Sequence, residues 1–138
     1  MRSSLLLTVL SFAMALVVMA ALAETNTTDG LKTVTVADLA ALRASGKVVV
    51  VDANGTDTRA RYGVIPDAVL LTRYDGYDVA RELPGDHARK LVFYCASERC
   101  MASHKAAQRA IDAGYVDVNV LPAGIMGWKD AGQPTRAM

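Results

Sequence analysis

The strongest constraint on the fold is a run of four valines followed by an acidic residue at positions 48–52. A run of β-branched side chains without polar alternation is typical of a strand that is buried on both faces. Such strands belong to parallel sheets whose two faces are covered by helices. A second apolar run, at residues 91–94, has the same character. These two runs therefore indicate an α/β fold.

Helical patterns separate the predicted strands. Apolar residues recur at helical spacing in residues 37–43 and 102–111, and shorter helices are predicted at 56–62 and 79–83. Further strands are predicted at residues 33–36, 69–71 and 116–121. This alternation predicts a mainly parallel central sheet flanked by helices and joined by right-handed crossovers.

The first 23 residues have the pattern of a secretory signal peptide. Arg2 precedes an apolar core, and the core ends in Ala21-Leu22-Ala23 before polar residues begin. A small-residue ending of this kind is typical of a cleavage site. We therefore expect cleavage after Ala23 and export, to the periplasm. The alternative is an uncleaved membrane anchor, because the core approaches the roughly 20 residues that span a bilayer.

Cleavage would leave a chain with the length of one domain. Removal of residues 1–23 from the 138 leaves 115, of which 24–30 are polar and predicted to be a flexible leader and 31–138 to form the domain. The full chain has 15 basic and 14 acidic residues, and Arg2 is the one charge that cleavage removes. The remaining net charge of zero argues against nucleic-acid binding. Membrane contact is expected only through an uncleaved signal segment.

One cysteine directly follows the second apolar strand. Cys95 is succeeded by a polar loop, residues 96–101, and then by a helical pattern. A helix dipole and unpaired backbone N–H groups stabilise a thiolate at such a position. Reactive groups of parallel sheets also collect at the carboxyl ends of strands. Cys95 is therefore predicted to be a nucleophile, and the alternative is a small buried hydrophobic residue.

Four marks follow one another along the chain. The first is Asp52 at the end of the valine strand, and the second is the Gly-Val-Ile-Pro-Asp-Ala run at 63–68. The third is the strand that ends at Cys95 together with the loop and helix that follow it. The fourth is the segment 122–132, which contains Gly-Ile-Met-Gly-Trp. In this order they resemble the rhodanese-like domain family over residues 31–134. The resemblance implies a sulfurtransferase in which Cys95 carries sulfur as a persulfide. Thiosulfate or another sulfane donor would supply the sulfur, and cyanide or a thiol would accept it.

The resemblance also implies roles for the residues around Cys95. Backbone N–H groups of the loop would hold the persulfide anion, and Asp52 would support the loop. A guanidinium at Arg99 could steer an anionic donor, whereas the carboxylate of Glu98 disfavours a thiolate. A solvated surface pair is the alternative interpretation of these two charges. The predicted persulfide-binding loop comprises Ala96, Ser97, Glu98, Arg99, Cys100 and Met101.

The chain departs from the family pattern at several places. Asn54, Val64 and Asp67 stand where the family usually has arginine, histidine and glycine. The segment after Cys95 is also about two residues longer than in small family members. Some phosphatases share this fold and need an arginine six positions after the cysteine, where this chain has Met101. That difference argues against phosphoryl transfer.

A second thiol in the loop leaves two interpretations open. Cys100 is either a resolving thiol that closes a reversible disulfide with Cys95, or a packing residue at the first turn of the helix. A disulfide that closes so short a ring constrains little of the unfolded chain, so a purely structural role is weakly motivated.

The alternatives to a transferase are a thiol-disulfide redox or persulfide-carrier module that uses Cys95 and Cys100, and a non-catalytic domain that binds an anion or a protein. The expected partners are a small sulfur-containing anion or a thiol protein. Cys95, Cys100, Met101 and His104 are soft ligands that suit Cu(I), but their spacing matches no metal template, so no metal is expected. No nucleotide-binding glycine motif indicates a cofactor.

Overall fold

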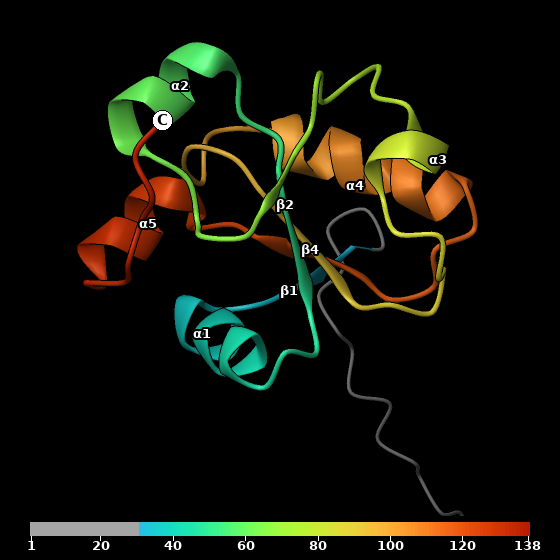
Figure 1. Ribbon diagram of the computed structural model, residues 1–138, viewed down its shortest axis with the longest axis horizontal. Coiled ribbons are helices and arrows are strands. Elements are labelled where there is room, and N and C mark those ends of the chain that lie inside the picture. Colours follow the sequence, from blue (N-terminus) through green and yellow to red (C-terminus); the bar gives the residue numbers. More distant parts are fainter. Residues whose placement is uncertain (1–30) are drawn as a thin grey trace, which may run out of the picture.

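The computed structural model describes residues 31–138 (Figure 1). The predicted signal peptide, residues 1–23, and the predicted leader, residues 24–30, lie outside the described residues. Within residues 31–138, no helix is both long enough and apolar enough to cross a bilayer.

Five parallel strands form one central sheet. In spatial order they are β1-β5-β4-β2-β3, and each neighbouring pair runs parallel. The predicted α/β fold with a mainly parallel sheet is therefore confirmed. The strands in chain order are β1 (Lys32–Thr33), β2 (Val49–Asp52), β3 (Val69–Leu70), β4 (Leu91–Tyr94) and β5 (Val118–Leu121).

Strand register brings the carboxyl ends of the three inner strands to one level. Asp52, the last residue of β2, pairs with Tyr94, the last residue of β4, and Tyr94 pairs with Leu121 of β5. Because β4 lies between β2 and β5, the residue after Tyr94 emerges at the middle of this edge. That residue is Cys95.

Helices cover both faces of the sheet (Figure 1). Alanines of α4 pack against Val51 and Phe93 on one face, while Leu39 of α1 and Trp128 of α5 pack against Val50 on the other. Successive strand residues serve opposite cores because side chains alternate across a strand. The helices are α1 (Val36–Ala44), α2 (Thr56–Tyr62), α3 (Val79–Glu82), α4 (Ala102–Asp112) and α5 (Gly124–Asp130).

The strand predicted at residues 33–36 extends too far. β1 ends at Thr33, and α1 begins at Val36. Thr35 is the N-cap of α1: its hydroxyl accepts from the Asp38 N–H at 3.1 Å, and the Asp38 carboxylate accepts from the Thr35 N–H at 3.1 Å. This reciprocal capping box stabilises a helix start, so it prevails over the alternating pattern of the sequence.

The C-terminal part of the domain also differs from the prediction. β5 begins at Val118, two residues later than predicted, because Val116 lies in the preceding turn with 74% of its surface exposed. Helix α5 was not predicted. It has no side-chain N-cap and contains two glycines, Gly124 and Gly127, which disfavour helices. Burial of Trp128 against the sheet compensates for this poor local propensity.

Candidate active site

Cys95 starts a loop that connects β4 to α4. Its side chain is 2% exposed, and α4 begins at Ala102 with Met101 as its N-cap. A turn shapes the loop, since the Cys100 N–H donates to the Ser97 carbonyl at 3.0 Å. The backbone thus curls back and returns Cys100 to the side of Cys95.

The N-terminus of α5 holds the start of this loop. The N–H of Ile125 donates to the Cys95 carbonyl at 2.8 Å, and the N–H of Met126 donates to the Ala96 carbonyl at 3.0 Å. Gly124, with φ of 62°, lies directly against the same two carbonyls. Residues of the segment 122–132 therefore support the loop through backbone hydrogen bonds.

Backbone donors of the loop and of the first turn of α4 are free. Within the described part of the chain, the N–H groups of residues 96–99 and 101–104 donate to no backbone or side-chain acceptor. Successive unpaired N–H groups at a curled loop and a helix N-terminus favour a bound anion. The loop can therefore stabilise a negative charge next to Cys95.

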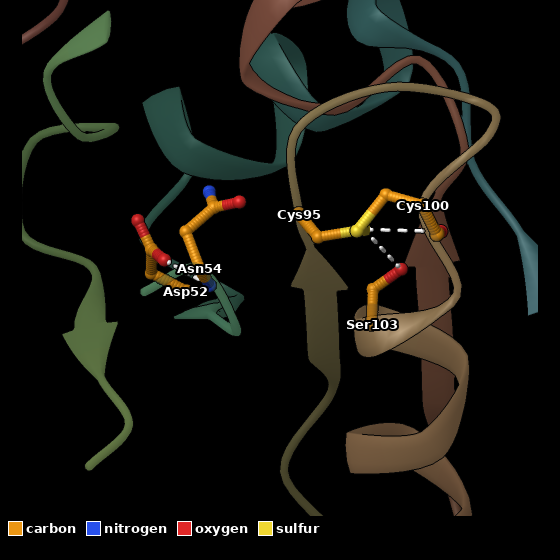
Figure 2. The surroundings of a disulfide bond; sticks show 5 residues. All are labelled: Asp52, Asn54, Cys95, Cys100 and Ser103. Atoms are coloured by element: carbon orange, nitrogen blue, oxygen red, sulfur yellow. Dashed lines mark hydrogen bonds between the residues drawn. A yellow bond between two sulfur atoms is a disulfide. The ribbon is translucent and has the colours of Figure 1, made fainter. Parts of the chain in front are cut away.

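The two cysteines of the loop are paired. Cys95 and Cys100 form a disulfide with Cα atoms 6.3 Å apart (Figure 2), and this separation lies in the usual range for disulfides. Cys100 precedes α4 instead of standing in its first turn, and it is partly buried against the core that contains Cys95. The loop thus brings together the two thiols that the sequence placed five positions apart.

A buried serine that sequence reasoning missed lies next to the sulfur of Cys95. Ser103 is 1% exposed, and its Oγ lies 3.3 Å from Cys95 Sγ (Figure 2). The Cys100 carbonyl oxygen is 3.1 Å from the same sulfur but has no proton to donate. A thiolate at Cys95 can therefore accept a hydrogen bond from Ser103. Position 103 lies on the same helical stripe as Ala106, Ala107 and Ala110. A polar serine in that apolar stripe was the sequence signal that could have identified Ser103 as a site residue.

Replacing Ser103 by alanine is expected to slow alkylation of the reduced Cys95 by more than about tenfold near neutral pH. The variant loses a hydrogen bond to a charged group, worth about 1.5–3 kcal/mol, and the thiolate is the reactive species. Trypsin cleaves after Arg99 and separates the two cysteines, so mass spectrometry can follow each thiol in one sample. Cys100 serves as the internal control, and an unchanged ratio of the two rates would contradict this role of Ser103.

A buried network joins the end of β2 to the residue before Cys95. Asp52 is fully buried, and its Oδ1 accepts from the Asn54 N–H at 2.7 Å and from Arg59 Nε at 3.2 Å. Its Oδ2 accepts from the Tyr94 hydroxyl, which itself accepts from the Ile65 N–H at 3.0 Å. Burial, reinforced by the neighbouring Asp52 carboxylate, raises the pKa of Tyr94 far above its ordinary value. Tyr94 therefore remains a neutral donor.

Arg59 is a second residue that sequence reasoning missed. It is 8% exposed and donates to the carbonyls of Asp52 at 3.1 Å and Leu71 at 2.9 Å, in addition to the Asp52 carboxylate. A guanidinium from α2 thus binds both the side chain and the backbone of the strand-end aspartate.

Three of the remaining predicted loop residues, Ser97, Glu98 and Arg99, line a groove between the loop and α5. Glu98 and Arg99 are exposed, and they border this groove of about 490 Å³ together with Met126 and Asp130 of α5. Met101 is 49% exposed. The groove therefore presents two carboxylates and one guanidinium to an incoming molecule. Within residues 31–138, no group of three His, Cys, Asp or Glu side chains is placed to hold a metal ion.

Fold and site together define an α/β domain with a cysteine on an anion-binding loop at the carboxyl edge of a parallel sheet. The family model of the rhodanese-like domain matches residues 35–131. The chain belongs to the rhodanese-like domain family. The resemblance expected from the sequence is thereby confirmed.

Solved structures agree with this assignment. A protein of unknown function from Rhodopseudomonas palustris CGA009, described as a possible tyrosine phosphatase, is 31% identical over 77% of this chain and 85% of its own, with a TM-score of 0.62. The rhodanese-like domain of an Anabaena sp. protein is 19% identical over 77% of this chain and 79% of its own, with a TM-score of 0.64.

A thiosulfate sulfurtransferase from Pseudomonas aeruginosa has the same fold. It is 22% identical over 78% of this chain but only 20% of its own length, with a TM-score of 0.62. No curated protein matches the chain. The fold is thus shared with a thiosulfate sulfurtransferase and with a protein of unknown function.

Proposed function

We propose that the protein is a sulfurtransferase that carries sulfur as a persulfide on Cys95. The observation that carries the proposal is the placement of Cys95 beside free N–H groups of a curled loop and a helix N-terminus. These donors suit a persulfide anion, and the Ser103 hydroxyl suits the preceding thiolate. Family membership and the shared fold of a thiosulfate sulfurtransferase support the same chemistry.

The reaction consists of two displacements at sulfur. The Cys95 thiolate attacks the outer sulfur of thiosulfate, the bond between the two sulfur atoms of thiosulfate breaks, and sulfite leaves with the electron pair. Cyanide or an external thiolate then attacks the outer sulfur of the persulfide and restores the Cys95 thiolate. We further propose that the protein is exported to the periplasm, which the signal-peptide pattern of residues 1–23 supports. The proposed donor is a small sulfur anion, and the proposed acceptor is cyanide or a thiol protein.

Phosphoryl transfer is not proposed, although one similar structure is described as a possible tyrosine phosphatase. A phosphatase of this fold needs a guanidinium six positions after its cysteine to hold the phosphate oxygens. Met101 occupies that position and has no charge. Arg99, four positions after Cys95, is exposed and lies on the groove.

A thiol-disulfide redox module is the second candidate function. The disulfide between Cys95 and Cys100 favours it, because paired cysteines in one loop are the usual setting for reversible exchange. In this candidate the loop exchanges electrons with a partner thiol protein and transfers no sulfur atom. A domain that binds an anion or a protein without turnover is the remaining alternative.

The test is sulfur transfer from thiosulfate to cyanide by the reduced protein. With cyanide in excess and a dithiol present to keep Cys95 and Cys100 reduced, wild type is expected to form thiocyanate catalytically, whereas Cys95→Ser is expected to fall to the uncatalysed rate because it has no nucleophile. Thermal unfolding of both proteins serves as the control for folding. Equal rates for wild type and Cys95→Ser would contradict the proposal. Reversible disulfide formation without thiocyanate would favour the redox module.

A further inference from the structure

The acceptor nearest to a persulfide on Cys95 belongs to the protein itself. Cys100 is paired with Cys95 in a disulfide, and the turn between Ser97 and Cys100 holds it beside Cys95. Cys95 is 2% exposed, whereas Cys100 is partly exposed at the rim. Because the loop already pairs Cys100 with the nucleophile, Cys100 can reach a persulfide on Cys95 directly, whereas an external thiol must first enter the site.

We propose that Cys100 discharges the Cys95 persulfide as hydrosulfide. This inference rests on the proposed function, since it requires a persulfide on Cys95. The Cys100 thiolate attacks Cys95 Sγ, the bond to the outer sulfur breaks, and the outer sulfur leaves with the electron pair and takes a proton. Both cysteines are oxidised to the disulfide seen in the structure, and the sulfane sulfur is reduced to sulfide.

The groups around the two sulfur atoms favour attack of Cys100 on Cys95 Sγ with departure of the outer sulfur. A leaving hydrosulfide is an anion, and the N–H groups of residues 96–99 and 101–104, which have no acceptor within residues 31–138, can stabilise it as it forms. The chain contains two cysteines in all, so no other intramolecular thiol can take the place of Cys100.

Regeneration of the thiols then requires a dithiol reductant. Its thiolate attacks the Sγ of Cys100, the more exposed residue of the pair, and the Cys95 thiolate leaves with stabilisation from the Ser103 hydroxyl at 3.3 Å. The second thiol of the reductant then resolves the mixed disulfide. One cycle converts thiosulfate and a dithiol into sulfite, hydrosulfide, a disulfide and one proton. The acceptor class is thus a dithiol, and the released product is sulfide instead of a transferred persulfide.

A single-turnover experiment tests the assignment. The protein is reduced, freed of reductant, and mixed with one equivalent of thiosulfate under anaerobic conditions without any other thiol. Wild type is expected to release one sulfite and one sulfide per chain and to lose the mass of two hydrogens. Cys100→Ser is expected to release sulfite alone and to gain the mass of one sulfur atom. Persulfide accumulation in wild type, with sulfite but without sulfide, would overturn this role of Cys100 and leave the transferase proposal intact.

A matched control moves the thiol by one residue. The double variant Cys100→Ser, Met101→Cys keeps two cysteines in the loop but places the second at the exposed N-cap of α4. It is expected to accumulate persulfide like Cys100→Ser. Release of sulfide by this variant would mean that any loop thiol suffices, and it would overturn the assignment to Cys100.

The reverse reaction separates the two proposals. Hydrosulfide added to the oxidised protein is expected to attack Cys95 Sγ and give a persulfide on the peptide that ends at Arg99, with a free thiol on Cys100. Wild type that releases no sulfite from thiosulfate but forms this persulfide would contradict the transferase on thiosulfate and support the exchange between Cys100 and Cys95. A persulfide on the Cys100 peptide instead would overturn the exchange.

Discussion

Replacing Asp52 by alanine is expected to lower the free energy of unfolding by about 3–5 kcal/mol. The variant leaves the Arg59 guanidinium, 8% exposed, without its carboxylate. The Tyr94 hydroxyl and the Asn54 N–H also lose their acceptors. Breaking a buried ion pair from one side is costly because the other charge stays buried and uncompensated.

Urea unfolding monitored by circular dichroism measures this loss of stability. Two further variants test whether it comes from the buried ion pair. Asp52→Ala combined with Arg59→Met removes both charges, and its loss should fall short of the sum of the two single losses by at least about 1 kcal/mol. Asp75→Ala removes one partner of an exposed pair with Arg73 and should change stability by about 1 kcal/mol or less. A similar small loss for Asp52→Ala would contradict a structural role of the network.

Replacing Gly124 by alanine is expected to destabilise the domain by about 2–5 kcal/mol, the sum of a left-handed backbone and an overpacked contact. Its φ is 62°, and an added Cβ would lie 2.5 Å from the Ala96 carbonyl carbon and oxygen and 2.7 Å from the Cys95 carbonyl oxygen. These are backbone atoms of the reactive loop, so they yield only if the loop moves. We therefore expect a loss of sulfur transfer as well as of stability.

Gly132→Ala provides the matched control. Gly132 has a φ of 73°, but an added Cβ would meet no atom within 4 Å. This variant should show the backbone strain alone, about 1–2 kcal/mol, and retain sulfur transfer. Urea unfolding and thiocyanate formation are measured on both variants at a temperature at which both are folded. Equal behaviour of the two variants would contradict the contact between α5 and the loop.

Local sequence signals were sufficient for much of the fold. The bounds predicted for α2 and β4 are those of the structure, and the valine strand begins one residue later than predicted. The position of Cys95 after a buried strand followed from the same patterns. These features depend on side-chain periodicity along one segment, which a single sequence displays.

Features that depend on contacts between distant segments were missed. Arg59 lies in a segment with an ordinary helical pattern, and only the approach of α2 to β2 turns it into the partner of Asp52. Ser103 gains its role because α4 packs on β4 beside Cys95. Helix α5 forms through the burial of Ile125 and Trp128 against the sheet, which outweighs its glycines. A single sequence carries no direct record of such contacts.

The hold of α5 on the loop has a consequence for the order in which the protein becomes reactive during synthesis. The carbonyls of Cys95 and Ala96 are fixed by the N–H groups of Ile125 and Met126. In a planar trans peptide the N–H points opposite to the C=O, so this hold also orients the N–H groups that follow Cys95. A nascent chain that ends before α5 already contains both thiols but lacks the groups that orient the loop. The site therefore takes its final form only in a chain that extends at least to Met126.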